Sequence, residues 1–210
     1  MATFLFGGTF DPPHRTHLHL ARTTLERDPE AELVLIPAGR SPFKVDHLQT
    51  QPHHRLAMLQ RALSSLPANL QERCQIDTVE LEKGDAEPTY TIDTVRQFQA
   101  LRPDARLRLI LGTDQLEAFD QWHEAEAIAR AAPLLILVRP PWSLPTVQAY
   151  LATEAPAFLR DAEVLDTVPD NVSSTSIRLS IARGEGIPDA VPAPVAEYIA
   201  EHGLYARSSS

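Results

Sequence analysis

The stretch FLFGGTFDPPHRTHLHL, residues 4–20, decides the fold. A short apolar run, residues 2–6, predicts a buried strand, which ends at Gly7 and Gly8. A polar turn follows, and a helical pattern begins near Thr16. A strand that passes directly into a helix predicts an α/β sheet, because such junctions lie at the carboxyl edge of the strands, where ligands bind.

The same junction has the features of an anion site. Two glycines let the backbone turn tightly and approach a ligand without a Cβ in the way. The new helix points its N–H groups and the positive end of its dipole at the junction. If the helix has begun by His14, both His14 and His17 lie on one of its faces, because they are three residues apart. The pattern therefore predicts a site for a phosphate chain.

Two other interpretations of the histidines remain open. His14 and His17 could form a solvated pair on the surface of the first helical turn. Together with His19 they could instead hold a metal ion. Zinc usually needs a fourth ligand or water, and Cys74 is the only thiol in the chain, so we predict no protein-bound metal.

Length, composition and charge exclude several classes of protein. The chain has 210 residues, of which 43% are hydrophobic, and this predicts one α/β domain with a sizeable core. No run of about 18 apolar residues occurs, and no secretory signal is visible, so we expect a cytoplasmic protein without a membrane span. The net charge of −9 argues against non-specific binding of nucleic acid, which depends on basic surface.

Strand and helix patterns alternate along the chain and predict a doubly wound, mostly parallel, Rossmann-like sheet with a small C-terminal helical part. We assign residues 1–207 to one domain, residues 169–207 to its C-terminal subdomain, and residues 208–210 to a disordered tail. Further strands are predicted at 32–36, 76–81, 107–111, 134–138 and 164–165. Helices are predicted after Gln51 and Tyr90, over residues 115–119 and 141–160, after Ser173, and over residues 192–202.

Two later segments add to the predicted site. Gly112 and Asp114 follow the strand at 107–111, which makes a second strand-to-helix junction at the same edge. The Ser/Thr cluster at 173–176 is typical of a helix cap, and Arg178 lies one turn further in. Hydroxyl groups, N–H groups and a guanidinium would then converge on one spot.

Residues 7–17, GGTFDPPHRTH, resemble the G-G-T-F-D-P-x-H-x-G-H signature of the nucleotidyltransferases that carry a His-x-Gly-His box. They are similar in particular to the bacterial nicotinate-nucleotide adenylyltransferase branch. Residues 172–178, VSSTSIR, resemble the I-S-S-T-x-x-R motif of that family, and the resemblance extends from about Thr3 to Tyr205. The chain departs from the pattern at Thr16, which replaces the box glycine, and at Phe43, which replaces a histidine.

The resemblance implies which residues bind ATP. The first motif would hold the phosphates through its backbone and its histidines, and the Ser/Thr motif would hold the triphosphate end. His14, His17 and Arg178 would be catalytic, with His17 nearest the α-phosphate. The implied ATP-binding residues are Gly7, Gly8, Thr9, Phe10, His14, His17, Lys44, Ser173, Ser174, Thr175 and Arg178.

The resemblance also implies a site for the acceptor nucleotide. Backbone N–H groups at the helix start near Tyr90 would receive the pyridine carboxylate, which an uncapped helix end favours over a neutral amide. Trp122 would provide a flat surface on which the pyridine ring stacks. Arg55 matches a further basic position of the family. The implied acceptor residues are Thr89, Tyr90, Thr91, Ile92, Asp114, Trp122, His123 and Arg139.

The implied reaction is adenylyl transfer from ATP to nicotinate mononucleotide, which gives nicotinate adenine dinucleotide and pyrophosphate in NAD biosynthesis. Mg²⁺ would accompany ATP. Two alternatives stay open: another acceptor, nicotinamide mononucleotide or phosphopantetheine, or a protein that binds nucleotides without catalysis. The predicted partners are ATP and nicotinate mononucleotide, with no nucleic acid and no membrane, and homo-oligomer formation is left open.

Overall fold

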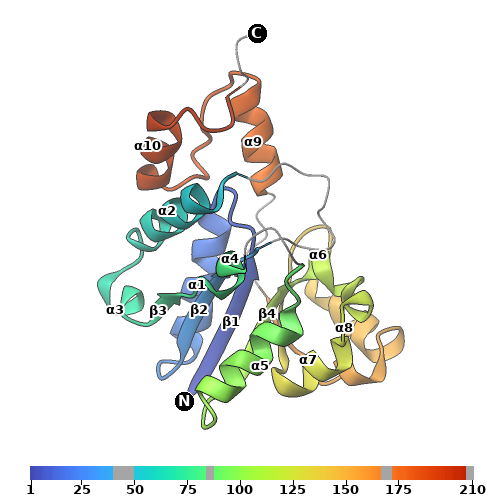
Figure 1. Cartoon of the computed structure of the whole chain (residues 1–210). Coiled ribbons are helices and arrows are strands. Elements are labelled where there is room, and N and C mark those ends of the chain that lie inside the picture. Colours follow the sequence, from blue (N-terminus) through green and yellow to red (C-terminus); the bar gives the residue numbers. More distant parts are fainter. Residues whose placement is uncertain (40–49, 84–87, 167–171, 207–210) are drawn as a thin grey trace.

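A parallel six-stranded sheet forms the centre of the structure. The computed structural model describes residues 1–39, 50–83, 88–166 and 172–206, and Figure 1 shows how its elements are arranged. The strand order is β3-β2-β1-β4-β5-β6, which is the order of a Rossmann-type sheet, so the predicted fold class is confirmed. The strands are β1 (Ala2–Gly8), β2 (Glu32–Pro37), β3 (Cys74–Ile76), β4 (Arg106–Gly112), β5 (Leu134–Leu137) and β6 (Glu163–Leu165).

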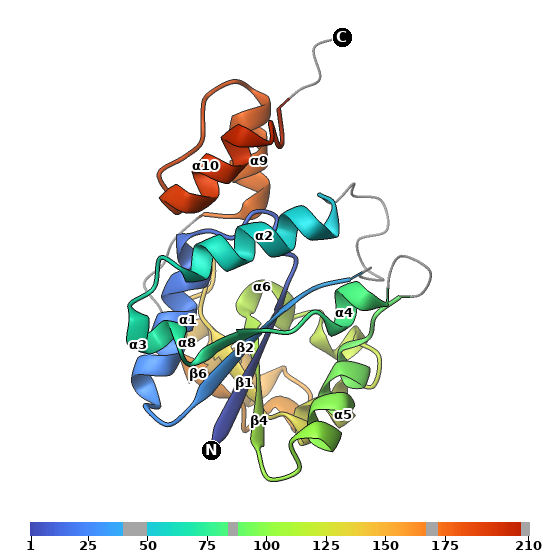
Figure 2. The ribbon, with the colours of Figure 1, turned by 60° about the vertical axis from the view of Figure 1, so that its left-hand side comes forward.

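Helices cover both faces of this sheet, and Figure 2 shows α1 and α5 on opposite sides of it. Buried side chains of α5, α7 and α8 pack on one face, and those of α1, α2 and α3 on the other. The α-helices are α1 (Arg15–Arg27), α2 (Pro52–Leu63), α3 (Ala68–Gln71), α4 (Val79–Glu82), α5 (Thr91–Leu101), α6 (Thr113–Leu116), α7 (Ala125–Ala131), α8 (Leu144–Thr153), α9 (Ser174–Ala182) and α10 (Ala193–Glu201). Two 3₁₀ turns are η1 (Phe119–Gln121) and η2 (Ala157–Leu159). Within the described ranges, no helix is long and apolar enough to cross a membrane.

The double layer of helices explains why the strands are readable in the sequence. A parallel strand that is covered on both faces buries every side chain, so it reads as a continuous apolar run. All four residues of β5 are buried, and β1 is buried over its first five residues. The register pairs Leu5 of β1 with Val34 of β2 and with Leu109 of β4.

The C-terminal helices form a separate small core on α2. Met58 and Ala62 of α2 are fully buried against a cluster that includes Val195 and Ile199 of α10. Leu59 faces the other way and belongs to the core under the sheet. α2 therefore joins α9 and α10 to the main body, and Figure 1 shows both helices beyond the carboxyl ends of the strands, opposite the N-terminus.

The predicted strand at 76–81 is wrong. β3 is shorter and ends at Ile76, and the chain then forms α4. The side chain of Asp77 accepts a hydrogen bond from the backbone N–H of Val79 at 2.9 Å. This local turn competes with the sheet, because an aspartate side chain can take the place of a neighbouring strand as hydrogen-bond partner.

The predicted helix at 141–160 is also wrong in extent. α8 ends at Thr153, and η2 begins only after Pro156. Proline has no N–H group and its ring clashes with the preceding helical turn, so the apolar pattern cannot continue as one helix.

Candidate active site

The carboxyl ends of β1 and β4 form the centre of the site. The two strands are neighbours, yet the chain runs from β1 to β2 on one side and reaches β4 only later. This is the topological switch point at which doubly wound sheets bind ligands. A Cβ at Gly112, the end of β4, would overlap the carboxylate of Asp114, whereas a Cβ at Gly7 would meet no atom. Gly7 therefore keeps space open beside β1.

The segment between β1 and α1, residues 9–14, is called the first turn below. A cavity of about 440 Å³ lies between this first turn and α9. All of the predicted ATP-binding residues in the described ranges line it, whereas Lys44 lies outside the residues that the structure describes. Imidazole, hydroxyl and guanidinium groups surround the cavity, and such groups bind the oxygens of an anionic chain. The lining includes Gly7, Gly8, Thr9, Phe10, His14, His17, Arg139, Ser173, Ser174, Thr175 and Arg178.

His14 and His17 lie side by side where α1 begins. Their ring centroids are 3.9 Å apart, and the backbone N–H of His14 donates a hydrogen bond to Nδ1 of His17 at 3.1 Å. Because Nδ1 accepts this bond, we infer that the neutral ring of His17 carries its proton on Nε2. The buried ring of Phe10 contacts His17 edge-on, with 5.0 Å between centroids, and fixes its position.

The pKa of His17 is lowered well below its ordinary value. Burial is the largest cause, and the positive charges of His14 and Arg139 lower it further. Protonation of Nδ1 would also oppose the N–H of His14 that it now accepts. His17 is therefore neutral at pH 7 in the free protein, and it offers a hydrogen-bond donor rather than a positive charge.

The sequence predicts that the N–H groups at the start of α1 face a ligand, but one of them is already bonded within the protein. The backbone N–H of Arg15 donates to the carbonyl oxygen of Ala190 at 2.8 Å, so this N–H group is not available to a ligand. Thr16, at the position of the box glycine, is 5% exposed and lines the larger cavity. Its side chain is accommodated within the first helical turn.

The Ser/Thr motif caps α9 as predicted. The hydroxyl of Ser173 accepts from the backbone N–H of Ser176 at 3.1 Å, and the backbone N–H of Ser173 donates to the Ser176 hydroxyl at 3.2 Å. This reciprocal pair is a capping box. Nη2 of Arg178, further along the same helix, donates to the hydroxyl of Thr175 at 3.3 Å.

α9 is bound directly to the first turn. The hydroxyl of Ser174 donates to the carbonyl oxygen of Pro12 at 2.9 Å, and Nη1 of Arg178 donates to the carbonyl oxygen of Asp11 at 2.6 Å. The two motifs therefore share one cavity.

Arg139 and Asp114 connect the ends of β4 and β5. Nη1 of Arg139 donates to Oδ1 of Asp114 at 3.3 Å, and Nη2 donates to the carbonyl oxygen of Val172 at 3.3 Å. Its backbone N–H donates to the hydroxyl of Thr113 at 2.9 Å. The sequence grouped Arg139 with the acceptor residues, but its side chain lines the larger cavity and not the smaller one.

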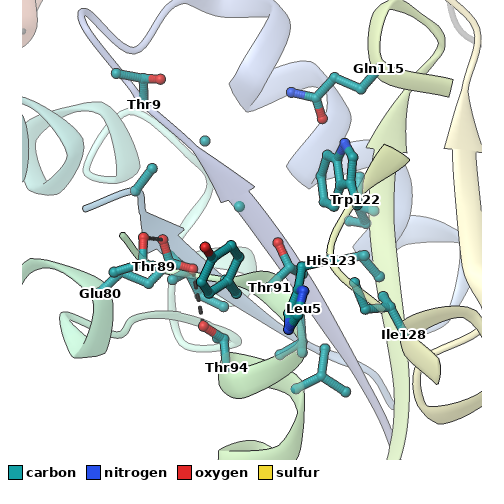
Figure 3. Close-up of a pocket in the computed structure, with 18 of the residues that line it drawn as sticks. Leu5, Thr9, Glu80, Thr89, Thr91, Thr94, Gln115, Trp122, His123 and Ile128 are labelled. Carbon is teal, nitrogen blue, oxygen red and sulfur yellow. Dashed lines mark hydrogen bonds between the residues drawn. The ribbon is translucent and has the colours of Figure 1, made fainter. Parts of the chain in front are cut away.

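The smaller cavity, about 330 Å³, opens on the other side of the same turn and is drawn in Figure 3. Glu80 and Thr89 lie on one side of it, and Trp122 and Gln115 on the opposite side. Trp122 is partly buried and packs on Phe119, with 5.1 Å between ring centroids. The lining includes Gly7, Gly8, Thr9, Glu80, Thr89, Tyr90, Thr91, Asp114, Gln115, Trp122 and His123.

The first turn of α5 offers backbone donors to this cavity. Tyr90 is the residue before the helix, and no side chain caps the helix start. Within the described part of the chain, the backbone N–H groups of Thr91 and Ile92 donate no hydrogen bond. An uncapped helix start of this kind attracts an anion. The ring of Tyr90 lies 4.7 Å from that of His123, centroid to centroid.

Two of the predicted acceptor residues have side chains that are otherwise engaged. Ile92 is 1% exposed and belongs to the hydrophobic core. The hydroxyl of Thr89 donates to the carboxylate of Glu80 at 3.2 Å. Ile92 itself does not line the smaller cavity, whereas Thr91 beside it does.

The two cavities share a wall. Gly7, Gly8, Thr9, Asp114 and Gln115 line both of them. A group bound in one cavity can therefore meet a group bound in the other across the carboxyl ends of β1 and β4.

Sequence reasoning missed Glu80 and Gln115 and left the role of Arg55 undecided. Glu80 fell within the segment predicted as a strand, and Gln115 has no signal beyond its place next to Asp114. Arg55 is 2% exposed, and its Nη1 donates to the carbonyl oxygens of Thr9 and Ala38 at 3.1 and 2.7 Å. It supports the first turn from behind.

Of the two carboxylates nearest the larger cavity, Asp11 and Asp114, only Asp114 is exposed enough to help bind a metal ion that is held mainly by the phosphates of a nucleotide. Among the described residues, no group of three or more His, Cys, Asp or Glu side chains could hold a metal ion. Both side-chain oxygens of Asp11 accept hydrogen bonds, from the hydroxyl of Tyr205 at 2.6 Å and the backbone N–H of Thr50 at 3.1 Å. Asp114 has a half-exposed side chain at the shared wall. One such carboxylate together with phosphate oxygens is a donor set that fits Mg²⁺.

The fold and this site define the protein as a nucleotidyltransferase of the cytidylyltransferase-like type, whose family model matches residues 5–180. Curated relatives include the probable nicotinate-nucleotide adenylyltransferases of Bordetella petrii, 40% identical over 96% of this chain and 97% of the relative, and of Gemmatimonas aurantiaca, 36% identical over 96% and 90%. The chain belongs to the nicotinate-nucleotide adenylyltransferase family. In fold it is similar to the Plasmodium falciparum nicotinic acid mononucleotide adenylyltransferase complexed with NaAD, with a TM-score of 0.77, 18% identity and 97% coverage of both chains.

Proposed function

We propose that this protein transfers the adenylyl group of ATP to nicotinate mononucleotide and releases pyrophosphate and nicotinate adenine dinucleotide, a step of NAD biosynthesis. The observation that carries the proposal is the wall shared by two cavities at the switch point. Relatives that are named nicotinate-nucleotide adenylyltransferase, at 36 and 40% identity, support it. A Plasmodium falciparum structure of the same fold contains NaAD, the product of this reaction.

ATP would bind in the larger cavity with its phosphates between the first turn and α9. The protein has a net charge of −9, so it must concentrate positive potential where polyanions bind. Arg139 and Arg178 supply two guanidinium groups, and the capped start of α9 adds its dipole. His14, His17 and the Ser/Thr cluster complete the set of donors. Lys44, which lies outside the described residues, remains a predicted phosphate ligand.

The acceptor would bind in the smaller cavity. Its pyridine ring would stack on Trp122, and its carboxylate would meet the uncapped backbone N–H groups of Thr91 and Ile92. Its phosphate would then lie toward the shared wall, next to the α-phosphate of ATP. His123 and Tyr90 would close the cavity around the ring.

The chemistry needs no base from the protein. A phosphate monoester has its second pKa near about 6, so the acceptor phosphate is mostly dianionic at pH 7 and can attack the α-phosphorus directly. The bond between that phosphorus and the β-phosphate oxygen breaks, and the electron pair leaves with pyrophosphate. The residues of the site align the two phosphates and stabilise the charge that develops. His17 would donate from Nε2 to the α-phosphate, and Arg178 would hold the leaving group.

A divalent metal ion is usual for a nucleotidyltransferase that uses ATP, and Mg²⁺ is our proposal for this chain. Bound to the phosphates, it would neutralise charge on the leaving pyrophosphate. Asp114 is the carboxylate that would help to hold it. Cytoplasmic location and a distinct subdomain at residues 169–207 remain predictions, and homo-oligomer formation stays open.

The experiment that tests the function is a pyrophosphate-release assay with ATP, Mg²⁺ and one acceptor at a time. We expect the highest kcat/KM with nicotinate mononucleotide. A preference for nicotinamide mononucleotide or phosphopantetheine would keep the chemistry and overturn the assigned acceptor. No release with any acceptor would favour the alternative of a nucleotide-binding protein without catalysis.

A further inference from the structure

Glu80 is a partly buried carboxylate on the wall of the smaller cavity, where an anionic ligand is expected. It accepts three hydrogen bonds. The backbone N–H of Gly39 and the hydroxyl of Thr89 donate to Oε2 at 3.3 and 3.2 Å, and the hydroxyl of Thr94 donates to Oε1 at 3.1 Å. Figure 3 shows Glu80 with Thr89 and Thr94 across the cavity from Trp122.

The three donors come from different parts of the fold. Gly39 follows the end of β2, Thr89 precedes α5, and Thr94 lies in the first turn of that helix. Packing around this junction is tight, because a Cβ at Gly39 would overlap the carbonyl oxygen of Glu80 and lie 3.0 Å from the methyl group of Thr89. Glu80 therefore connects the start of α5 to the edge of the sheet.

A carboxylate suits this junction for a chemical reason. Ionised glutamate only accepts hydrogen bonds, whereas glutamine carries an NH₂ group that must itself find an acceptor. Burial raises the pKa of Glu80, although its hydrogen bonds from Thr94, Gly39 and Thr89 and the charge of Lys83 lower it in part. The three hydrogen bonds, by contrast, stabilise the charged form.

We propose that Glu80 is a positioning residue of the acceptor cavity, which holds the first turn of α5 so that the backbone N–H groups of Thr91 and Ile92 face the acceptor. The bonds to Thr89 and Thr94 flank this turn on both sides. They also direct both hydroxyl protons toward Glu80. The hydroxyls of Thr89 and Thr94 are then not donors to a ligand, and the backbone N–H groups of the helix start, which bind a carboxylate better than a carboxamide, remain available.

This inference rests on the proposed function and makes it more specific. It assigns acid-over-amide selectivity to a residue that touches neither the reacting phosphates nor, by its own carboxylate, the acceptor. The selectivity is the ratio of kcat/KM for nicotinate mononucleotide to kcat/KM for nicotinamide mononucleotide.

The test compares Glu80→Ala and Glu80→Gln with Glu82→Ala and Glu82→Gln. Glu82 is a matched control, because it lies on the same short helix and accepts a hydrogen bond from the hydroxyl of Thr78 at 2.5 Å, but it is exposed and lines neither cavity. For each variant we would measure the KM for both pyridine nucleotides, the KM for ATP, kcat, and the Tm.

We expect Glu80→Ala to raise the KM for nicotinate mononucleotide about tenfold, as for loss of a buried hydrogen-bond network, and to lower the acid-over-amide ratio by a similar factor. The KM for ATP should stay within about twofold. Glu80→Gln keeps the shape but brings an NH₂ group among three donors, and its KM and ratio should fall in between. The Glu82 variants should resemble the wild type.

Three other results would contradict either the role of Glu80 or the proposed function. An unchanged acceptor KM and an unchanged ratio in Glu80→Ala, with or without a lower Tm, would overturn the positioning role. If Glu80→Ala does not fold, Glu80→Gln decides, and wild-type selectivity in that variant would overturn it. A wild-type protein that does not use nicotinate mononucleotide at all would overturn the proposed function itself, and this outcome is visible before any variant is made.

Discussion

Arg178 donates a hydrogen bond of 2.6 Å to the backbone carbonyl oxygen of Asp11, which lies 167 residues earlier in the chain. This bond joins the helix α9 to the turn that follows β1. It also orients the guanidinium, whose Nη2 is near Thr175 on the wall of the larger cavity. An arginine that is already held by the protein loses little freedom when it binds a phosphate, so its position is prepared before the ligand arrives.

Replacing this arginine should impair the use of ATP. Arg178→Lys keeps the charge but cannot contact both Asp11 and a phosphate through one planar group, and we expect kcat/KM for ATP to fall about 10- to 100-fold. The acceptor KM should change by less than about twofold. Steady-state kinetics with each substrate varied in turn would measure both values. Arg183→Lys, an exposed arginine just after the same helix, is the control, and equal kinetics of both variants would contradict the assignment.

Tyr205 should stabilise the same turn from the C-terminal side. Its hydroxyl donates to Oδ1 of Asp11 at 2.6 Å, and burial, followed by the charge of Asp11, raises the pKa of this tyrosine. Tyr205→Phe leaves a carboxylate that is 2% exposed without one of its donors, which should cost about 1–3 kcal/mol of unfolding free energy. Urea denaturation would measure it.

The control for this change is Tyr150→Phe. The hydroxyl of Tyr150 makes no hydrogen bond within the described residues, so its removal should be close to neutral. Equal unfolding free energies for the two variants would show that the bond to Asp11 contributes nothing measurable.

Trp122 should determine acceptor affinity. Trp122→Ala removes the flat surface of the smaller cavity, and we expect the acceptor KM to rise about tenfold or more, while the KM for ATP rises much less. Trp142→Ala is the matched control, because Trp142 packs on Tyr150 and lines neither cavity. Equal increases of both KM values in Trp122→Ala would contradict its assignment to the acceptor.

The sequence predicted the parts of this site that local chemistry determines. Glycines at the ends of two apolar runs, the histidine pair at i and i+3, and the Ser/Thr cap each depend on neighbours in sequence. Once the strands were recognised, the rule that ligands bind at the carboxyl edge of a parallel sheet brought the junctions after residues 2–6 and 107–111 together. This rule and the family resemblance together also predicted that the motifs at residues 7–17 and 172–178 would line one cavity.

The remaining parts depend on tertiary contacts that no local pattern reveals. The position of Glu80 depends on hydrogen bonds from Gly39, which lies 41 residues earlier in the chain, and from Thr94, which belongs to a different helix. A strand was predicted at 76–81, but β3 ends at Ile76, where Asp77 forms a local side-chain bond instead. The burial of Arg55 under Thr9 is likewise visible only in the folded chain.

His17 should be the main catalytic donor. His17→Asn can still accept the backbone N–H of His14 through its side-chain oxygen, but it lacks the imidazole Nε2–H, and we expect kcat to fall about 10²- to 10³-fold. The KM for ATP should change far less, because the other phosphate ligands remain. Rapid-quench kinetics would show whether the chemical step itself is slowed, and near-wild-type turnover would remove His17 from the mechanism.

The lowered pKa of His17 should also appear in the pH dependence of stability. Burial, with the charges of His14 and Arg139, makes the folded protein bind this proton less readily than the unfolded chain does. Below pH 6.5, the ordinary histidine value, the unfolded chain therefore binds more protons, and stability is lost as the pH falls toward the lower folded-state pKa. We expect the Tm of the wild type to drop between about pH 7.5 and pH 5.5, and this drop to be smaller in His17→Asn.

His54 serves as the control for this change. Its pKa is also lowered, by burial and by His53 and His202, but it lies nearer the surface, so His54→Asn should reduce the drop in Tm less. A pH dependence in His17→Asn that matches the wild type would show that His17 does not titrate as its surroundings require.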